Sequence, residues 1–258
     1  MSAPPTAVIC PLPVAEPRAR IFLLHHAAGS HRAFTDWVRL FPADWEVCLL
    51  EAPGRRRLSH LPPAGSAAGL AAFFLDRIRP RLDRPYALFG HSMGAAVAFE
   101  LAALLHRADA PLPHWLGVSA CRAPVHAADR LHARPLHALP DPELRSVLSR
   151  MEGLPARALA DEEVWRRLAP RIREDFRLAE EWRPSTGTVP SGVALSLFGG
   201  AQDPVVSHRQ LAAWGQAAVQ PIGRHIYRGG HFYFRVHTRS VVDRIVTESR
   251  RAGLSPAA

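Results

Sequence analysis

The chain has 258 residues, which fits one large α/β domain or two small ones and is enough to bury a core without disulfide staples. Its formal net charge is +9, and because it contains no lysine, all 32 residues counted as Lys or Arg are arginines. The lack of lysine excludes a Ser–Lys dyad, a Schiff base and a P-loop, and the lack of asparagine excludes a Cys–His–Asn triad.

Six short apolar runs are predicted to be strands. They lack the alternation of one-sided sheets, as is typical of parallel strands covered on both faces. In chain order they are Ile21–Leu24, Val47–Leu50, Tyr86–Phe89, Trp115–Val118, Val193–Phe198 and His225–Tyr227. The helices predicted around them are Ser66–Arg79, Ala95–His106, Ser207–Gln216 and Phe232–Arg250. This alternation predicts one α/β domain over residues 1–258, with a mostly parallel central sheet flanked by helices.

The alternation breaks between about residues 131 and 183, where we expect only helices. The predicted ranges are Asp141–Met151, Asp161–Leu168 and Arg171–Trp182. Asp141 and Asp161 are predicted N-caps, with Pro142 at the first helical position. We interpret the segment as a lid inserted into the domain, with ordinary packing helices as the alternative. Its large apolar residues could line a substrate pocket or pack the lid; they are Leu148, Met151, Leu154 and Trp165.

The run Gly90-His91-Ser92-Met93-Gly94 has the G-x-S-x-G spacing of a nucleophile elbow. It lies between a predicted apolar strand and a predicted Ala-rich helix, so it falls at a strand-to-helix turn. Glycines at both ends allow a sharp bend, and the helix N-terminus offers N–H groups to a developing anion. We therefore predict that Ser92 is a nucleophile.

A serine nucleophile needs a base, usually a histidine oriented by a carboxylate. Asp203 follows a predicted strand in a Gly-rich turn, and His231 follows the last strand and a Gly-Gly turn. The order Ser, acid, His is that of the α/β-hydrolase fold, which we predict here. Asp129 and Asp141 are weaker candidates for the acid, and a simple turn before Pro204 is the structural alternative for Asp203.

An oxyanion hole needs two backbone N–H groups. One should come from Met93, directly after the nucleophile. The other should come from the loop after the first strand, where Ala27 is the candidate. His25 and His26 in this loop could be metal ligands, but no matching Cys or carboxylate cluster accompanies them, and packing is favoured.

The remaining composition predicts a cytoplasmic protein. Cys10, Cys48 and Cys121 are scattered and odd in number, which argues against a disulfide framework or a Cys-rich metal site. The first 17 residues are proline-rich, unlike a signal peptide, and no apolar stretch approaches membrane-spanning length. The arginine excess fits coding bias; a surface for nucleic acid or an acidic protein is the alternative.

With these motifs in place, the chain resembles the type II thioesterases that accompany polyketide synthases and nonribosomal peptide synthetases. The resemblance covers nearly the whole chain. It rests on Phe22–Ser30, Ala52–Arg55, Arg84–Ala95, Phe99–Ala102, Ser119–Pro124, Leu139–Asp141, Gly199–Pro204 and Gly229–Phe232. Two departures stand out: Ala28 replaces a usual glycine, and Arg173-Glu174-Asp175 stands where the family often has R-A-D.

The resemblance implies hydrolysis of acyl groups stalled on the phosphopantetheine arm of acyl or peptidyl carrier proteins. In that reaction His231 deprotonates Ser92, Asp203 orients His231, and the N–H groups of Ala27 and Met93 hold the oxyanion. No metal, no cofactor of the protein's own, no nucleic acid and no membrane are expected, and we expect a monomer. An esterase or acyltransferase with the same triad, or a non-catalytic binding protein, are the alternatives.

Overall fold

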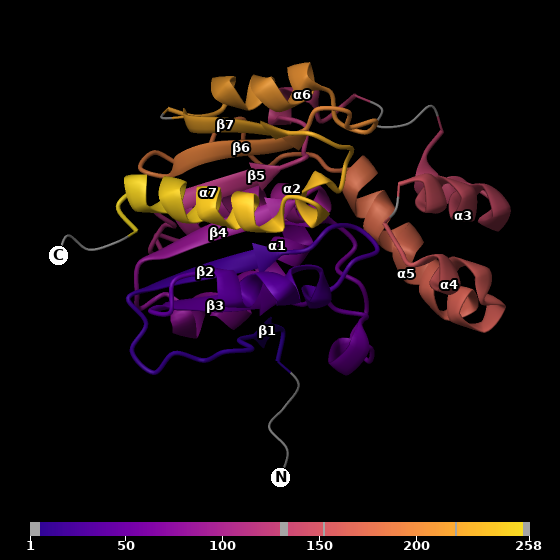
Figure 1. Cartoon of the computed structure of the whole chain (residues 1–258), viewed down its shortest axis with the longest axis horizontal. Helices are drawn as coiled ribbons and strands as arrows, with labels where there is room; N and C mark the ends of the chain where they lie inside the picture. The colour runs from indigo at the N-terminus through magenta and orange to yellow at the C-terminus, as the bar shows by residue number, and fades with distance from the viewer. Residues whose placement is uncertain (1–5, 130–133, 152, 220, 255–258) are drawn as a thin grey trace, which may run out of the picture.

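The computed structural model describes residues 6–129, 134–151, 153–219 and 221–254. Its centre is a seven-stranded sheet in the order β1-β3-β2-β4-β5-β6-β7, parallel except for β1 (Figure 1). The strands are β1 Val8–Ile9, β2 Ala19–Leu24, β3 Trp45–Leu50, β4 Tyr86–His91, β5 Trp115–Ser119, β6 Ala194–Gly200 and β7 Pro221–Tyr227. All six predicted strands are confirmed. The two-residue edge strand β1 is too short to show a pattern.

Helices cover both faces of the sheet. Alternate residues of β2 enter two separate cores: Phe22 and Leu24 pack with helices α1 (Ala67–Ile78) and α2 (Met93–Arg107), whereas Ile21 and Leu23 pack with α7 (Thr238–Arg251). Helix α7 crosses the front of the sheet in Figure 1, and α1 and α2 lie behind it. Burial on both faces explains why the strands are continuous apolar runs.

The segment from residue 134 to residue 183 is helical, as predicted, but its helices differ from the prediction. They are α3 Asp141–Arg150, α4 Ala156–Ala160 and α5 Glu162–Glu180. The two helices predicted on either side of Pro170 are one helix, because a continuous apolar face that includes Trp165, Ile172 and Phe176 is buried along its length. Residues 131–133 of the expected segment lie outside the described residues.

The two predicted caps of this segment differ in outcome. Asp161 caps α5, since its side chain accepts hydrogen bonds from the N–H groups of Glu163 and Val164. The prediction for Asp141 is wrong: Pro140 is the N-cap and Asp141 is the first helical residue, so Pro142 is the second. The Asp141 carboxylate instead accepts a hydrogen bond from the Arg173 guanidinium at 2.5 Å.

The later helices are also shorter than predicted. The stretch after Ser207 forms α6 (His208–Ala212), with Ser207 as its N-cap in a capping box. The predicted helix at Phe232 begins as a 3₁₀ turn, and α7 starts only at Thr238. The 3₁₀ helices are η1 His31–Leu40, η2 Arg56–Leu58, η3 Arg79–Arg81, η4 Pro124–His126, η5 Leu136–Ala138, η6 Ala213–Gln216 and η7 Tyr233–Arg235.

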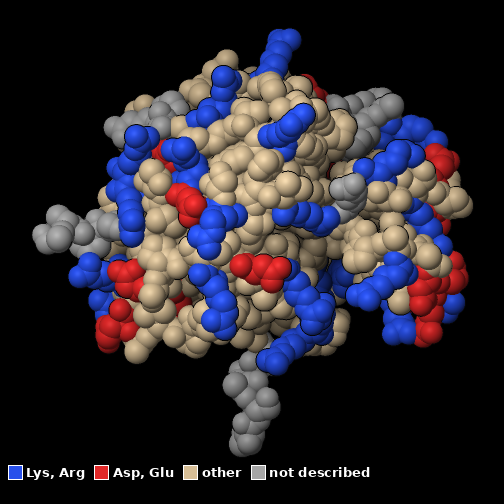
Figure 2. Space-filling view, viewed as in Figure 1, with Lys and Arg blue, Asp and Glu red and all other residues tan. Residues whose placement is uncertain are grey.

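The surface is rich in arginine. Arginine side chains are spread over the face shown in Figure 2, and acidic side chains are fewer. Among the described residues, the helices are all too short or too polar to cross a lipid bilayer.

Candidate active site

Ser92 lies at the turn between β4 and α2, as the G-x-S-x-G spacing predicts. Its backbone has φ 56° and ψ −118°, a strained conformation for a residue with a side chain. The Ser92 N–H donates to the carbonyl of Ser119 at 2.8 Å, which ties the turn to the end of β5. Strain at a single serine between a strand and a helix is the geometry of a nucleophile elbow.

The two glycines of this motif are required by close backbone contacts. A Cβ on Gly90 would lie 2.1 Å from the carbonyl oxygen of Gly94, and a Cβ on Gly94 would lie 2.2 Å from that of Leu24. Both obstacles are backbone atoms, which cannot rotate away. The spacing of the motif therefore reflects how tightly α2 packs against the ends of β2 and β4.

Asp203 and His231 lie side by side at the carboxyl ends of β6 and β7. The Nδ1 atom of His231 lies 2.9 Å from one Asp203 carboxylate oxygen and 3.1 Å from the other. Both side chains are almost fully buried, with 3% and 2% of their surfaces exposed. The N–H groups of Val205 and Val206 donate to the same carboxylate and fix its orientation. Because Asp203 engages Nδ1, Nε2 is the nitrogen left to face a substrate.

The two weaker candidates for the acid are engaged elsewhere. Asp129 is paired with His126 at 2.8 Å, and Asp141 is paired with Arg173. Neither is bonded to His231, so the structure brings only Asp203 of the three to this histidine.

The loop after β2 carries Ala27, the second predicted oxyanion donor. Nδ1 of His25 lies 2.8 Å from the His26 carbonyl, and Nδ1 of His26 lies 2.8 Å from the Ala27 carbonyl, so each ring donates to the backbone. Burial lowers the pKa of His26 to about 3 and that of His25 well below its usual value, so both rings are neutral. These contacts agree with the packing role favoured for both histidines.

An ion pair not predicted from the sequence anchors this loop. The Asp175 carboxylate on α5 accepts the Ala28 N–H at 2.7 Å and pairs with the Arg55 guanidinium. Arg55 also donates to the Gly29 carbonyl at 3.0 Å. The Arg55 and Asp175 side chains are both buried, so the helical segment and the loop after β3 together fix the backbone around Ala27.

Ala28 itself is strained, with a φ of 62°. This is the left-handed region that favours glycine. An alanine at this position therefore has a conformational cost, although the Ala28 N–H still reaches Asp175. Among the hydrogen bonds of the described residues, none has the Ala27 or Met93 N–H as its donor.

A chain of buried polar groups lies behind the elbow. Nδ1 of His91 lies 2.8 Å from the Ser119 hydroxyl, which lies 2.6 Å from the Tyr233 hydroxyl. The His91 ring centre lies 5.1 Å from that of His231. Burial lowers the pKa of His91 well below its usual value, so a neutral ring packs against His231.

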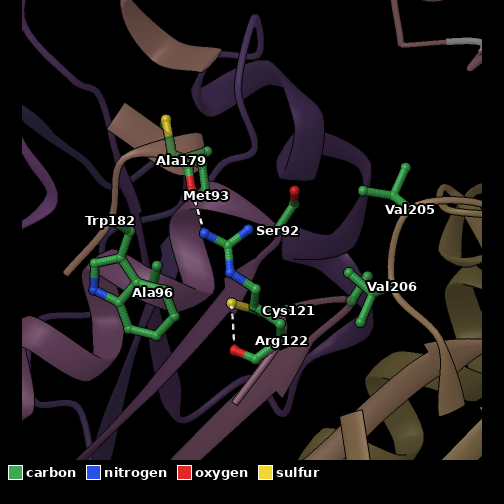
Figure 3. Close-up of a pocket in the computed structure, with 10 residues that line it drawn as sticks. Ser92, Met93, Ala96, Cys121, Arg122, Ala179, Trp182, Val205 and Val206 are labelled. Atoms are coloured by element: carbon green, nitrogen blue, oxygen red, sulfur yellow. Dashed lines mark hydrogen bonds between the residues drawn. The ribbon is translucent and has the colours of Figure 1, made fainter. Parts of the chain in front are cut away.

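A small cavity of about 30 Å³ opens beside Ser92 (Figure 3). Its lining is mainly apolar and includes Ala96, Val206 and Trp182. The buried Arg122 closes one side and donates to the Ala179 carbonyl at 3.3 Å, so it holds the end of α5 against the site. The segment 134–183 thus reaches the cavity through Ala179 and Trp182. Leu148 and Trp165 are buried in the core, and the partly buried Met151 and Leu154 pack against it.

Comparison with known proteins decides the family. A model described as "Thioesterase domain" matches residues 19–248. The chain belongs to this thioesterase family. It is 30% identical to the gramicidin S biosynthesis protein GrsT of Aneurinibacillus migulanus over 216 residues, covering 84% of this chain and 83% of that protein. It is 33% identical to the thioesterase PikA5 of Streptomyces venezuelae, covering 86% and 77%.

A solved structure supports the same assignment. The type II thioesterase BorB from the borrelidin biosynthetic cluster superimposes with a TM-score of 0.85 at 29% identity, covering 96% of this chain and all of that one. The α/β-hydrolase fold predicted from the sequence is therefore confirmed, as is the assignment of the chain as a thioesterase.

In this thioesterase the main residues missed by the sequence analysis are Asp175 and Arg55. Both stand where the family has motifs, at Arg173-Glu174-Asp175 and Ala52–Arg55, but the motifs alone do not indicate that the two side chains meet. Asp175 lies between the buried Ile172 and Phe176, so it is a charged residue on the apolar face of a helix. This pattern is the sequence feature that could have indicated a buried ion pair.

Proposed function

We propose that the chain hydrolyses acyl thioesters carried on the phosphopantetheine arm of acyl or peptidyl carrier proteins. In this role it would edit stalled or mis-primed polyketide or nonribosomal peptide assembly lines. The observation that carries the proposal is the buried Asp203–His231 hydrogen bond in a thioesterase-family chain whose Ser92 occupies a strained elbow. The names of relatives such as BorB support the pathway.

In the proposed reaction His231 Nε2 takes the proton of the Ser92 hydroxyl, and Ser92 Oγ attacks the thioester carbonyl. The tetrahedral intermediate collapses, the C–S bond breaks, and the thiol of the arm leaves with the proton from His231. Water then attacks the acyl-serine with His231 as base and releases the acid. Asp203 holds the tautomer of His231 and stabilises its charged form.

The oxyanion of each intermediate would accept hydrogen bonds from the N–H groups of Met93 and Ala27. Met93 is the first residue of α2, so the helix N-terminus adds a favourable field. Such a donor contributes about 3 kcal/mol to transition-state stabilisation. The reaction uses no cofactor of the thioesterase itself, because the arm belongs to the carrier protein.

We further propose that the segment of about residues 131–183 acts as a lid. Ala179 and Trp182 line the cavity at Ser92, and Asp175 holds the loop of Ala27. A movement of α5 would therefore change both the cavity and the oxyanion hole. This arrangement supports a gating role over simple packing.

The carrier protein would dock at a basic hollow near the oxyanion loop. This hollow has a volume of about 330 Å³, and its lining includes Arg32, Arg56 and Arg57. It lies beside the carboxyl ends of β2 and β3, since these residues follow the loops after those strands. Carrier proteins are usually acidic, so a basic surface here would speed their encounter.

The test is release of acyl groups from a loaded holo carrier protein. Ser92→Ala should abolish release, whereas the control Ser149→Ala, at an exposed serine of α3, should leave it unchanged. Turnover retained in Ser92→Ala would exclude the serine mechanism. Faster turnover of small oxygen esters than of carrier-bound thioesters would favour an esterase, and transfer to an added alcohol or amine would indicate an acyltransferase.

A further inference from the structure

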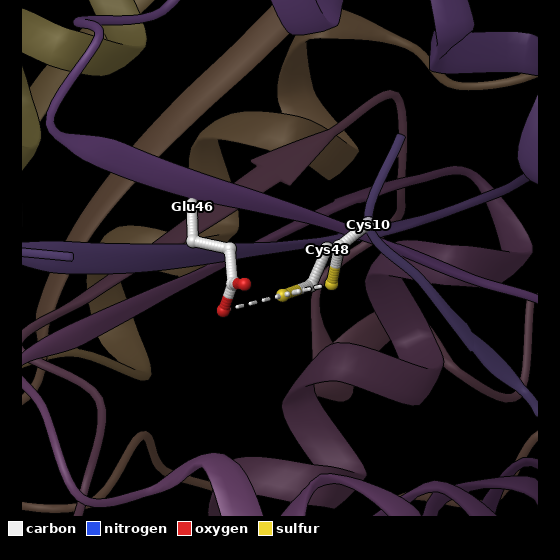
Figure 4. Close-up of side chains that lie close together, drawn as sticks. All are labelled: Cys10, Glu46 and Cys48. Carbon is white, nitrogen blue, oxygen red and sulfur yellow. Dashed lines mark hydrogen bonds between the residues drawn. The ribbon is translucent and has the colours of Figure 1, made fainter. Parts of the chain in front are cut away.

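Cys10 and Cys48 lie opposite each other at the edge of the sheet (Figure 4). Their sulfur atoms are 3.3 Å apart, although 38 positions separate them in the chain. The antiparallel register of β1 and β3 pairs Val8 with Leu50 and Ile9 with Leu49. One more step in the same register places Cys10 directly across from Cys48. Two cysteines that are far apart in the sequence are therefore neighbours in the fold, although both are free thiols in this structure.

The pairing site suits a bond between the two sulfurs. The Glu51 N–H donates to the Ala7 carbonyl at 2.8 Å, which marks Ala7 and Glu51 as a hydrogen-bonded pair. Such pairs alternate along an antiparallel ladder, so Cys10 and Cys48 occupy a non-hydrogen-bonded position. Cα atoms at these positions are about 4.5 Å apart, within the range of about 4.4–6.8 Å that a disulfide spans.

The two thiols differ in exposure and in acidity. Cys10 is partly exposed, whereas Cys48 is completely buried. The hydrogen bond from Cys48 lowers the pKa of Cys10, and the charges of Arg81 and Arg20 add to this effect. The same contact and burial raise the pKa of Cys48. Cys10 is thus the accessible thiolate, and Cys48 is the protected partner beside it.

We propose that Cys10 and Cys48 form a redox-responsive thiol pair that closes to an intramolecular disulfide when the protein meets a hydroperoxide. The Cys10 thiolate attacks the peroxide, the O–O bond breaks, and a sulfenic acid and water (or an alcohol) form with uptake of one proton. The Cys48 sulfur then attacks the Cys10 sulfur, and a second water leaves. The pair loses two electrons to the peroxide, and a thiol reductant reverses the reaction.

A metal site is the alternative for this cluster. Among the described residues, Cys10, Cys48 and Glu46 are the one group of at least three His, Cys, Asp or Glu side chains close enough to share an ion. However, Glu46 already accepts a hydrogen bond from Arg20 at 2.6 Å, and the adjacent guanidinium charge would repel a cation. The two sulfurs are in contact, and the carboxylate that would complete a metal site is already bonded to Arg20. The cluster therefore favours a disulfide over a metal site.

The consequence of oxidation would be a covalent staple between the edge strand and the sheet. The disulfide would close a loop between residues 10 and 48, which restricts the unfolded chain. We therefore expect the oxidised protein to unfold at a temperature several degrees higher than the reduced protein. This inference does not depend on the proposed function.

The test is titration of the reduced full-length protein with hydrogen peroxide, followed by unfolding, alkylation of free thiols and mass spectrometry. We expect a loss of two hydrogens, a cross-link between the peptides of Cys10 and Cys48, and one alkylated thiol at Cys121. Reduction should restore all three thiols. If Cys10 and Cys48 both remain alkylated after peroxide treatment, or if the bond forms between two molecules, the proposal fails.

Three variants complete the experiment. In Cys48→Ser, the sulfenic acid of Cys10 should persist and react with dimedone, whereas Cys10→Ser should give no dimedone adduct on Cys48. The control Cys121→Ser should still form the cross-link. Zinc is the probe for the alternative: tight one-to-one binding by the wild-type protein that is lost in both Cys10→Ser and Cys48→Ser would overturn the disulfide in favour of a metal site.

Discussion

The Asp175 carboxylate and the Arg55 guanidinium form a buried ion pair that joins helix α5 to the loop after β3. The same carboxylate accepts the Ala28 N–H, one residue from the proposed oxyanion donor Ala27. Arg55 in turn donates to the Gly29 carbonyl. The pair therefore sets the position of a backbone N–H that the proposed reaction needs.

The first prediction concerns this pair. Asp175→Asn keeps an acceptor for Ala28 but removes the charge opposite Arg55, so the loop should lose its fixed position. We expect kcat for a carrier-bound thioester to fall about 10- to 100-fold with little change in KM, since a misplaced oxyanion donor weakens the transition state rather than substrate binding. Steady-state kinetics over a range of carrier-protein concentrations measures both constants.

The matched control for Asp175→Asn is Glu174→Gln, its neighbour on α5, whose partner is Arg177. Among the hydrogen bonds and ion pairs of the described residues, this more exposed pair has none to the loop of Ala27, and its loss should change kcat less than twofold. Equal losses in the two variants would contradict the positioning role of Asp175.

A second prediction follows from the strained backbone of Ala28, whose φ is 62°. Ala28→Gly removes the Cβ that opposes this conformation and keeps the N–H that binds Asp175. The free energy of unfolding should rise by about 1 kcal/mol. Urea denaturation followed by circular dichroism measures the change, and a clear loss of stability would show that the strain is absent.

The third prediction compares two glycines. A Cβ on Gly94 would lie 2.2 Å from the Leu24 carbonyl oxygen, whereas a Cβ on Gly187 has no heavy atom within 4 Å. Gly94→Ala should lower the free energy of unfolding by about 3 kcal/mol or more and impair the elbow of Ser92. Gly187→Ala should be tolerated in both respects. Thermal unfolding of the two variants distinguishes them, and similar midpoints would refute the packing argument.

The fourth prediction is a loss of stability in acid. Burial holds the pKa of His26 at about 3, and those of His25 and His91 well below 6.5. The unfolded chain protonates these rings near their usual pKa of about 6.5, but the native state does not. Their contribution is therefore fully present above about pH 6.5 and declines as the pH falls toward 3. Each such ring steepens the decline by up to about 1.4 kcal/mol per pH unit.

Urea denaturation at a series of pH values between about 6.5 and 4 tests this. His26→Gln should reduce the slope of the unfolding free energy against pH by up to about 1.4 kcal/mol per pH unit, which is the effect of one proton. This change in slope is expected whatever the variant does to the absolute stability. A pH dependence as steep as that of the wild-type protein would mean that His26 is protonated in the native state.

The fifth prediction concerns the basic hollow at Arg32, Arg56 and Arg57. The double change Arg56→Glu and Arg57→Glu should raise KM for a carrier-bound thioester about tenfold and weaken its dependence on salt, because it reverses the charge that attracts an acidic partner. Turnover of a small soluble thioester should be unchanged. The control is Arg250→Glu. Arg250 lies in the last turn of α7, and this helix runs away from His231. If Arg250→Glu raises KM as much as the double change does, the hollow is not a specific docking site.

Local sequence patterns are sufficient to predict the strands, the elbow and the order of the candidate triad. These features depend on local patterns: apolar runs for strands buried on both faces, and glycines where two backbones meet. Ser92, Asp203 and His231 were each found at the end of a predicted strand, and the structure confirms the hydrogen bond between the last two. Parallel strands bring their carboxyl ends to one edge of the sheet. The position of each residue just after a strand was therefore enough to predict that the candidate residues share this edge.

The contacts between distant segments, in contrast, become visible only in the folded chain. Asp175 reaches Ala28 across 147 positions, and Cys10 meets Cys48 through a two-residue strand too short to leave a pattern. Helix α5 continues through Pro170, against the local preference, because the apolar face on both sides of the proline is buried. Burial of an apolar face and pairing of buried charges join residues that are far apart in the chain. The residues around each position in the sequence therefore do not indicate which distant residue will be its partner.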